Sequence, residues 1–335
     1  MKILILRFSS IGDIVLTTPV IRTLKEQLEG AAIHYCTKKE YQGLVNNNPH
    51  LDKVHVLDDS MGELIKELKA EKFDYIIDLH HNLRTARIKF SLSAKAYSFN
   101  KLNWEKWLYV KLKINRLPNR HIVDRYMDTV APLGVKMDNR GLDYYIPEKD
   151  EVELDWLPEE YRGRYVALAI GAHHATKRLP VERLIELCDR INKPVVLLGG
   201  KEDAAVGERV ASFFERPEHS IYEQKLTEEL NKRAIVFNGC GKFNLNQSAY
   251  LVKKSIAQFT HDTGLMHIGA AFRKPVYSIW GNTVPEFGMY PYRTKFTVFE
   301  NNSLSCRPCS KIGHSKCPKG HFKCMKDVKF DFYIP

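Results

Sequence analysis

The first half of the chain alternates short apolar runs with segments in which apolar residues recur every three or four positions. The runs predict buried strands, and the recurring positions predict helices that cover a sheet. Strands are expected over Lys2–Phe8, Ala32–Thr37, Lys53–Leu57 and Phe73–Leu79, and helices over Ile14–Leu28 and Met61–Ala70. This alternation is typical of a parallel sheet with helices on both faces.

The second half repeats the alternation. Strands are expected over Tyr165–Ile170, Pro194–Leu198, Ile256–Thr260 and Pro275–Trp280, and helices over Pro180–Ile191, Ala204–Phe214, 246–253 and Gly264–Phe272. A polar stretch, 147–164, separates the halves. We therefore expect an α/β protein of two Rossmann-like, doubly wound domains, 1–155 and 156–300, that face each other across a cleft. A Cys-rich tail, 301–335, is expected to pack back on the body.

Composition limits the class of protein. The 335 residues are 44% hydrophobic, which excludes a disordered chain, and no apolar run approaches the ~18–20 residues of a membrane span. The apolar run before Arg7 is too short for a secretory signal, so a cytoplasmic protein is expected. The net charge of +11 indicates an anionic partner: nucleic acid, a phosphorylated substrate or a membrane surface.

Three common nucleotide-site motifs are absent from the sequence. The nearest approach to Gly-x-Gly-x-x-Gly is at Gly239 and Gly241, where Asn244 replaces the third glycine. This weakens a dinucleotide-dehydrogenase interpretation. The sequence also lacks a P-loop and the Asp-x-Asp pair with which many metal-dependent sugar transferases hold a nucleotide diphosphate.

The loop after the first expected strand carries a candidate functional carboxylate. Ser9–Asp13 ends that strand and opens a helix, which is where open α/β sheets place functional groups. The positive end of the helix dipole would hold Asp13 ionised. The alternative is that Asp13 only caps the helix.

A second loop, Asp262–His267, also lies between a strand and a helix. Free backbone N–H groups at a helix start suit a phosphate, and Gly264 permits a ligand to approach the backbone closely. His267, one turn into the helix, could donate to the same anion. The alternative is that Asp262 or Thr263 caps the helix and His267 is a core histidine.

Two further loops contribute candidates for the same ligand. Lys177 and Arg178 come just before a helix, where cations oppose the dipole unless an anion lies between them, which favours a diphosphate site over a solvated basic loop. The glycine-flanked loop 239–245 contains Phe243, whose ring could stack on a purine or belong to the core.

The tail contains a cysteine motif, Cys306-x2-Cys309-x7-Cys317-x6-Cys324, with two interleaved histidines. Four thiols within nineteen residues could hold a structural zinc that pins a polar tail. The second pair lacks the C-x2-C spacing, so free thiols are the alternative.

Together these motifs resemble those of the bacterial ADP-heptose:lipopolysaccharide heptosyltransferases of glycosyltransferase family 9. The resemblance covers nearly the whole chain. Its matching segments are Arg7–Pro19, Thr176–Pro180, Asp262–His267, Cys306–Cys309 and Cys317–Cys324. It implies a GT-B fold, with the acceptor on the N-terminal domain and the nucleotide sugar on the C-terminal domain.

The resemblance also implies inverting transfer of heptose from ADP-heptose to a lipopolysaccharide inner-core acceptor, with no obligatory metal. Asp13 is then the general base, and Lys177 neutralises the leaving diphosphate. The implied donor site comprises His173, Thr176, Lys177, Lys242, Phe243, Asp262, Thr263, Gly264, Leu265 and His267. The expected acceptor contacts are Ser10, Gly12, Arg84, Arg87 and Arg120.

Two other functions are weighed against this one. The same fold could transfer another nucleotide sugar or use another glycan acceptor. A basic nucleic-acid-binding protein would explain the charge, but it would leave Asp13, Lys177 and Asp262 without a role, so no nucleic acid partner is expected.

A basic segment, 84–125, has eleven basic and two acidic residues. Within it Trp104, Trp107, Leu108 and Leu112 form one apolar helical stripe. The stripe could rest in the inner face of the inner membrane beside the anionic acceptor, which predicts a peripheral protein. Alternatively, the two tryptophans pack into the N-terminal core under a solvated basic face.

Overall fold

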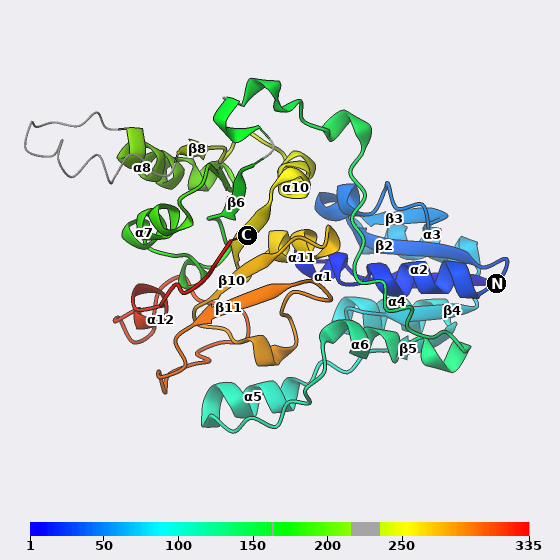
Figure 1. The fold of residues 1–335 in the computed structure, drawn as a ribbon. Helices are drawn as coiled ribbons and strands as arrows, with labels where there is room; N and C mark the ends of the chain where they lie inside the picture. Colours follow the sequence, from blue (N-terminus) through cyan, green and yellow to red (C-terminus); the bar gives the residue numbers. More distant parts are fainter. Residues whose placement is uncertain (158, 163, 216–234, 335) are drawn as a thin grey trace, which may run out of the picture.

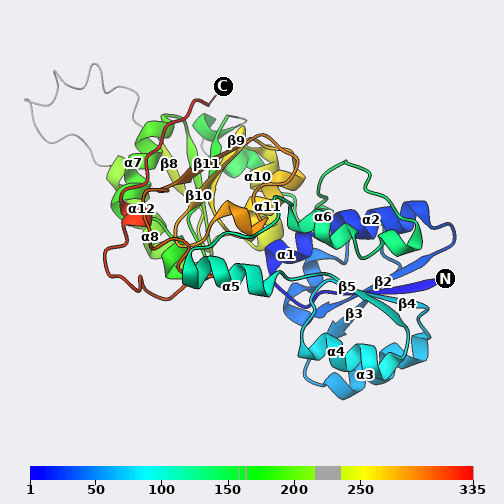
Figure 2. The same ribbon diagram turned by 90° about the horizontal axis from the view of Figure 1, so that it is seen from below.

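The computed structural model describes residues 1–157, 159–162, 164–215 and 235–334 and contains two parallel β-sheets flanked by helices (Figures 1 and 2). The N-terminal sheet has the order β3-β2-β1-β4-β5, and the C-terminal sheet has the order β11-β10-β9-β6-β7-β8. This confirms the predicted two-domain α/β fold. The expected linker, 147–164, contains residues 158 and 163, which lie outside the described residues, and the domain bounds at 155 and 300 stay a prediction.

The strands agree closely with the predicted apolar runs, and three short strands were not predicted. In the N-terminal sheet they are β1 (Lys2–Leu6), β2 (Ala32–Lys38), β3 (Lys53–Leu57), β4 (Tyr75–Asp78) and β5 (Lys95–Ser98). In the C-terminal sheet they are β6 (Val166–Ala169), β7 (Val195–Leu198), β8 (Val236–Asn238), β9 (Ala257–His261), β10 (Val276–Trp280) and β11 (Phe296–Glu300). The three that the sequence pattern missed are β5, β8 and β11.

The helices cover both faces of each sheet. In the N-terminal half they are α1 (Ile11–Val15), α2 (Thr18–Gln27), α3 (Met61–Glu71), α4 (Leu83–Leu92), α5 (Asn103–Leu112) and α6 (Ile122–Met127). In the C-terminal half they are α7 (Val181–Ile191), α8 (Ala204–Glu215), α10 (Leu245–Lys254), α11 (Gly264–Ala271) and α12 (Lys323–Lys326). Short 3-10 turns include η3 (Glu148–Asp150), η4 (Leu154–Trp156) and η5 (Glu159–Tyr161) in the linker.

The predicted single helix over Ile14–Leu28 is wrong, because the chain breaks between α1 and α2. Pro19 has no N–H to donate into a helix that continues from α1, and its ring is suited to a first turn instead. The hydroxyl of Thr17 donates to the carbonyl of Ile14 at 2.7 Å and closes the end of α1. Asp13 therefore lies on a short helix of five residues.

Strand β1 is apolar throughout because both faces of the sheet are covered. Ile3 and Ile5 belong to the core under α2 and α6, whereas Leu4 and Leu6 face α3 and α4. Figure 2 shows the two helix layers on opposite sides of the N-terminal sheet. The loops at the carboxyl end of β1 are thus held by buried strands on both sides.

The two domains touch directly where α1 meets α11 (Figure 1). Ile14 of α1 and Ile268 of α11 belong to the same buried cluster, so the core continues from one domain into the other. Loops that follow β1 and β9 therefore meet at this contact. The arrangement brings the two strongest motifs of the sequence together.

Helix α5 shows that the core interpretation of the two tryptophans is wrong. Trp104 is 66% exposed and Trp107 is 41% exposed, and their rings stack at 5.1 Å on the surface. No helix among the described residues is both long enough and apolar enough to cross a bilayer.

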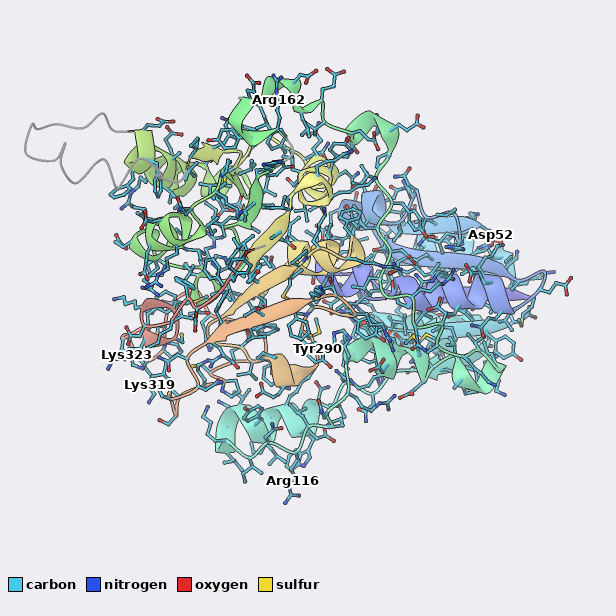
Figure 3. All side chains as sticks on the ribbon, in the orientation of Figure 1. Asp52, Arg116, Arg162, Tyr290, Lys319 and Lys323 are labelled. Atoms are coloured by element: carbon cyan, nitrogen blue, oxygen red, sulfur yellow. The ribbon has the colours of Figure 1, made fainter. Side chains whose placement is uncertain are left out.

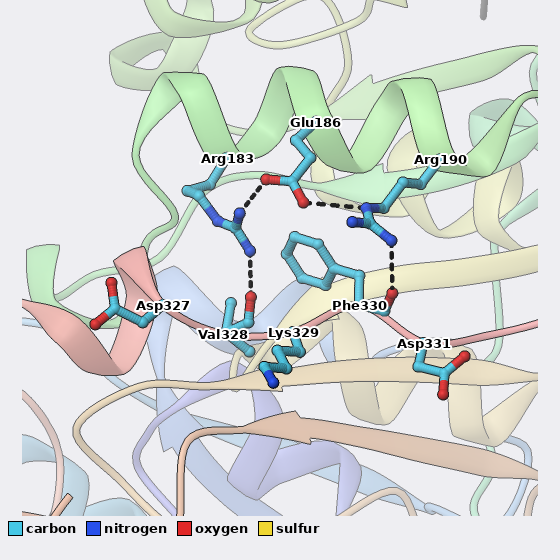
Figure 4. Close-up of a pocket in the computed structure, with 8 residues that line it drawn as sticks. All are labelled: Arg183, Glu186, Arg190, Asp327, Val328, Lys329, Phe330 and Asp331. Atoms are coloured by element: carbon cyan, nitrogen blue, oxygen red, sulfur yellow. Dashed lines mark hydrogen bonds and ion pairs between the residues drawn. The ribbon is translucent and has the colours of Figure 1, made fainter. Parts of the chain in front are cut away.

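The last described residues lie along α7 (Figure 4). Arg183 bonds both the Glu186 carboxylate and the Val328 carbonyl, and Arg190 donates to the Phe330 carbonyl at 3.1 Å. The guanidinium of Arg183 also lies 4.8 Å from the centre of the Phe330 ring. These contacts attach the end of the chain to the C-terminal domain.

Candidate active site

Asp13 is held at both carboxylate oxygens. Its Oδ1 pairs with the Arg7 guanidinium at 2.8 Å, and its Oδ2 accepts the Ser10 hydroxyl at 2.8 Å and the Ser10 N–H at 3.2 Å. Ser10 is the N-cap residue of α1, so Asp13 does help to cap the helix. The side chain is nevertheless 22% exposed, which leaves it accessible to a substrate.

Arg7 anchors this carboxylate to the N-terminal sheet. Its guanidinium is almost completely buried and also donates to the Leu79 carbonyl at 2.5 Å and to the Tyr126 hydroxyl at 2.9 Å. Burial opposes ionisation of Asp13, but Arg7 and Ser10 outweigh it and hold the pKa of Asp13 below its ordinary value. Asp13 is therefore an ionised, oriented carboxylate at neutral pH.

His267 connects Asp13 to the second domain. It is 2% exposed, its Nδ1 has no hydrogen-bond partner among the described residues, and its ring lies directly against Gly12. Burial lowers the pKa of His267 to about 4, although Asp262 and Asp13 both act to raise it. A neutral imidazole thus lies within electrostatic reach of both carboxylates.

Lys177 and Asp262 form an ion pair on the C-terminal side of the site. The Lys177 ammonium donates to Asp262 Oδ2 at 2.5 Å and to the Asp262 carbonyl at 3.1 Å. Thr283, after β10, donates to the same Oδ2 at 2.8 Å. Because this carboxylate is engaged outside the helix, the interpretation of Asp262 as a plain helix cap is wrong.

The N-terminus of α11 has no side-chain cap. Thr263 is the N-cap residue, but its side chain makes no bond to the helix. Its hydroxyl lies 3.4 Å from the Thr260 hydroxyl instead. The first N–H groups of α11 thus receive no cap from the Thr263 side chain, and the Lys177 ammonium bonds Asp262 just before them, an arrangement that suits a phosphate.

Gly264 and Gly12 are required by the domain contact. A Cβ on Gly264 would lie 2.6 Å from Ile11 Cγ2, and one on Gly12 would lie 2.6 Å from His267 Cδ2. In this structure Ile11 of the other domain packs closely against Gly264. The sequence predicted that a ligand would make this close approach. The His267 imidazole covers Gly12. Gly12 therefore serves the packing of α1 against α11 more directly than it serves contact with an acceptor.

Five predicted donor residues remain, and each has different surroundings. His173 is exposed beside His174, whereas the Thr176 hydroxyl exchanges hydrogen bonds with the backbone of His314 in the tail. Phe243 is half-buried against the C-terminal core. The two others are engaged elsewhere: Lys242 lies 4.5 Å from the Phe237 ring, and the Leu265 carbonyl accepts from Gln258 at 2.9 Å.

The predicted acceptor residues do not form one cluster. Ser10 touches Asp13, but Arg84 and Arg87 lie exposed on α4. Arg120 pairs on the surface with Asp128 at 2.9 Å. The structure thus brings Ser10 to the site and leaves the three arginines on surfaces of the N-terminal half.

Several residues around Asp13 were not predicted as site residues. Arg7 and Tyr126 position its carboxylate, and two lysines of the basic segment, Lys101 and Lys106, lie within its electrostatic reach. Burial and then Arg125 lower the pKa of Lys106 to about 8. The positive charge of the basic segment 84–125 was the only sign of these lysines in the sequence. The spacing of the basic residues could not show which of the lysines face Asp13.

Two parallel-sheet α/β domains that meet at α1 and α11 have the architecture of the GT-B class of glycosyltransferases. The sequence profile described as glycosyltransferase family 9 (heptosyltransferase) matches residues 61–319, and the chain belongs to this family. It is therefore an enzyme, a glycosyltransferase.

Individual relatives agree with this assignment. Lipooligosaccharide heptosyltransferase 2 of Haemophilus influenzae is 26% identical over 342 residues, which cover 93% of each chain. A family 9 glycosyltransferase from Veillonella parvula has a TM-score of 0.70 at 25% identity and covers 89% of this chain and 86% of its own. ADP-heptose lps heptosyltransferase II of Escherichia coli has a TM-score of 0.66 at 18% identity and covers 98% of both.

Proposed function

We propose that the enzyme transfers a heptose from ADP-heptose to a lipopolysaccharide inner-core acceptor with inversion at the anomeric carbon. The observation that carries the proposal is that α1, with Asp13, contacts α11 directly, and that Asp13 and the Lys177–Asp262 pair, one from each domain, both lie within electrostatic reach of His267. A base and a diphosphate site that face each other are what displacement at a sugar carbon needs. The names of the relatives supply the donor and the acceptor class.

The proposed reaction is a single displacement. The acceptor oxygen bonds to the anomeric carbon as the bond from that carbon to the diphosphate oxygen breaks, and Asp13 takes the hydroxyl proton. Negative charge develops on the leaving diphosphate, where the Lys177 ammonium and the N-terminus of α11 stabilise it. Because Arg7 holds Asp13 ionised, the base is ready at neutral pH.

We propose that this chemistry has no obligatory metal ion at the donor diphosphate. The positive charge comes instead from Lys177 and the α11 N–H groups. Turnover is therefore expected to be independent of added magnesium or manganese. A strict requirement for either ion would contradict this part of the proposal.

The experiment that tests the donor is calorimetric binding of ADP-heptose, ADP-glucose, UDP-glucose and GDP-mannose, combined with measurement of released nucleotide. The proposal predicts selective binding of ADP-heptose. Preference for UDP-glucose or GDP-mannose would overturn the donor assignment, although Asp13 could still serve as base.

We also propose that α5 rests on the anionic inner face of the inner membrane. Trp104, Trp107 and Leu112 are exposed on it, and Leu112 is 54% exposed. Arg116, just beyond the helix, points away from the body (Figure 3). Exposed tryptophans beside cationic side chains are the chemistry that binds a lipid interface.

Co-sedimentation with vesicles containing anionic lipid tests this surface. Trp107→Ala is expected to reduce binding, because its ring supplies apolar area at the interface. Phe213→Ala removes a comparably exposed ring from α8 and is the matched control. Equal binding by both variants and the unaltered protein would contradict the assignment of α5.

A further inference from the structure

The tail, 301–335, contains cysteines and lysines that the transfer reaction does not use. Its four cysteines carry free thiols, and among the described residues no group of three metal donors within 4.8 Å of one another includes any of them. A zinc site in the tail therefore stays a prediction from the sequence. The lysines, in contrast, lie on a surface that the structure defines.

The positive charge of the protein is concentrated in two segments. The basic segment 84–125 has a net charge of +9, and the tail has seven basic and two acidic residues, a net charge of +5. Because the whole chain carries +11, everything outside these two segments sums to −3. An anionic partner is therefore attracted to these two segments and not to the molecule as a whole.

The two segments lie side by side because helix α5 is bonded to the tail near both of its ends (Figures 1 and 2). Just after the helix, the Lys113 ammonium donates to the Pro308 carbonyl at 2.7 Å and to the Cys306 carbonyl at 3.1 Å. At the start of the helix, the Asn103 carbonyl accepts from the Lys311 ammonium at 3.3 Å. The tail thus runs antiparallel to α5 between these contacts.

The same stretch of the tail is fixed to the C-terminal domain. Arg307 is buried, and its guanidinium donates to the Gly281 carbonyl at 2.5 Å and to the Thr283 carbonyl at 3.0 Å. The Cys309 N–H donates to the Asn282 carbonyl at 3.0 Å. The surface that α5 and the tail form together therefore includes both halves of the protein.

Exposed apolar side chains lie where the two segments meet. Trp104 directly follows Asn103, and Ile312 directly follows Lys311. The bond between Lys311 and Asn103 therefore brings the residues that follow them close together. Ile312 is 63% exposed, almost as much as Trp104, and its N–H donates to the Ser310 hydroxyl at 3.1 Å, which fixes it in a turn. Ile312 thus extends the apolar surface of α5 onto the tail.

Cations surround this apolar surface. Lys111 and Arg116 are exposed at the end of α5, and Lys316, Lys319 and Lys323 are exposed along the tail. Figure 3 shows Arg116, Lys319 and Lys323 at the outer edge of the molecule. None of these five side chains forms an ion pair with another described residue, so their charge is available to a partner.

We propose that the tail is the second half of a membrane-docking surface, in which Ile312, Lys316 and Lys319 contact the same anionic bilayer as α5. The inference rests on the proposed membrane contact of α5 and extends that contact to the C-terminal domain. Nucleic acid would also attract the lysines, but it offers no apolar phase for an exposed isoleucine. A bilayer accepts apolar side chains at its interface and attracts the cations around them.

Co-sedimentation with vesicles of phosphatidylglycerol and phosphatidylcholine in equal parts tests the charge of the tail. The double variant Lys316→Gln/Lys319→Gln is expected to bind about tenfold more weakly, because each lysine near an anionic leaflet strengthens binding several-fold. Lys66→Gln/Lys69→Gln, on the exposed side of α3, removes the same charge outside both basic segments and is the matched control. Equal binding by the two double variants would overturn the role of the tail.

A neutral substitution tests whether the partner is a lipid. Ile312→Ala is expected to weaken vesicle binding roughly threefold or more with no change in charge, because less apolar area enters the interface. Ile235→Ala, at a position 44% exposed outside both segments, is the matched control. Unchanged vesicle binding by Ile312→Ala, together with tighter binding to a DNA duplex than to the vesicles, would overturn the lipid assignment.

Trp107→Ala, measured in the same assay, separates the tail from α5. Weaker binding by Trp107→Ala and by both tail variants is the expected result. Weaker binding by Trp107→Ala alone would overturn the inference about the tail and leave the contact of α5 in place. Unaltered binding by all three variants would overturn both. Because the substituted side chains are exposed, each variant is expected to keep the Tm of the unaltered protein.

Discussion

The ring of His267 packs against Gly12 so closely that a Cβ at position 12 would lie 2.6 Å from His267 Cδ2. This contact fixes α1, with the proposed base, against α11, with the proposed diphosphate site. The contact between the two domains and the proposed active site therefore coincide. A change that separates α1 from α11 would also separate the base from the donor.

Gly12→Ala is expected to lower kcat by about 10²-fold, because moving Asp13 by an ångström misaligns it with the acceptor hydroxyl. Gly62→Ala is the matched control, since the nearest atom to its Cβ would be Ser60 Oγ at 3.7 Å. Steady-state kinetics on both variants checks this. Unchanged kcat in Gly12→Ala would show that the contact does not position Asp13.

Removing Arg7 is expected to move the acid limb of the pH profile. Arg7 and Ser10 hold the pKa of Asp13 low, and activity needs the carboxylate, so activity is present above that pKa and lost as pH falls through it. Arg7→Met should raise the pKa and shift the acid limb of kcat/KM to higher pH. Arg7→Lys keeps the charge and should shift it less. Superimposable profiles would contradict this role of Arg7.

Lys177→Met is expected to weaken ADP binding by roughly tenfold to a hundredfold, because a charge-assisted bond to the diphosphate is lost. Adenosine lacks the diphosphate, so its affinity should change little. Calorimetry with both ligands makes the comparison, and Lys253→Met, on the exposed side of α10, is the control. Equal losses for ADP and adenosine would place Lys177 away from the diphosphate.

The N-terminal domain is expected to lose stability in mild acid. Burial lowers the pKa of His34 to about 4, and burial also lowers the pKa of His55. The unfolded chain binds these protons near the ordinary pKa of about 6.5, so stability present above that value falls as pH drops towards 4. Tm should fall from pH 7.5 to pH 5, and less steeply in His34→Gln. Parallel slopes in both proteins would contradict the assignment.

The sequence predicted the buried strands well and the edge strands poorly. Continuous apolar runs such as β1 exist because both faces of the sheet are covered. Both β5 and β11 lie at sheet edges, where many side chains are exposed, so their residues lack the apolar run that identifies a strand. The helix break was missed because apolar spacing continues across Pro19.

The residues of the candidate site also fall into two groups, those recognised from the sequence and those that only the structure reveals. Asp13, Lys177 and Asp262 were recognised as candidates because each follows a strand within a recognisable loop. Arg7 and Thr283 act through tertiary contacts with Asp13 and Asp262, and no spacing along the chain reports those contacts. The family resemblance implied a donor contact for Thr176, whereas its hydroxyl bonds the backbone of His314 in the tail.

The most direct test of the central claim is the effect of Asp13→Asn on transfer and on nucleotide binding, measured on the same preparation. Asparagine keeps the size of the side chain and an oxygen for Arg7 but cannot take a proton. The account predicts a fall in kcat of about 10²–10⁴-fold with ADP affinity essentially unchanged. Transfer at close to the normal rate would show that Asp13 is not the base.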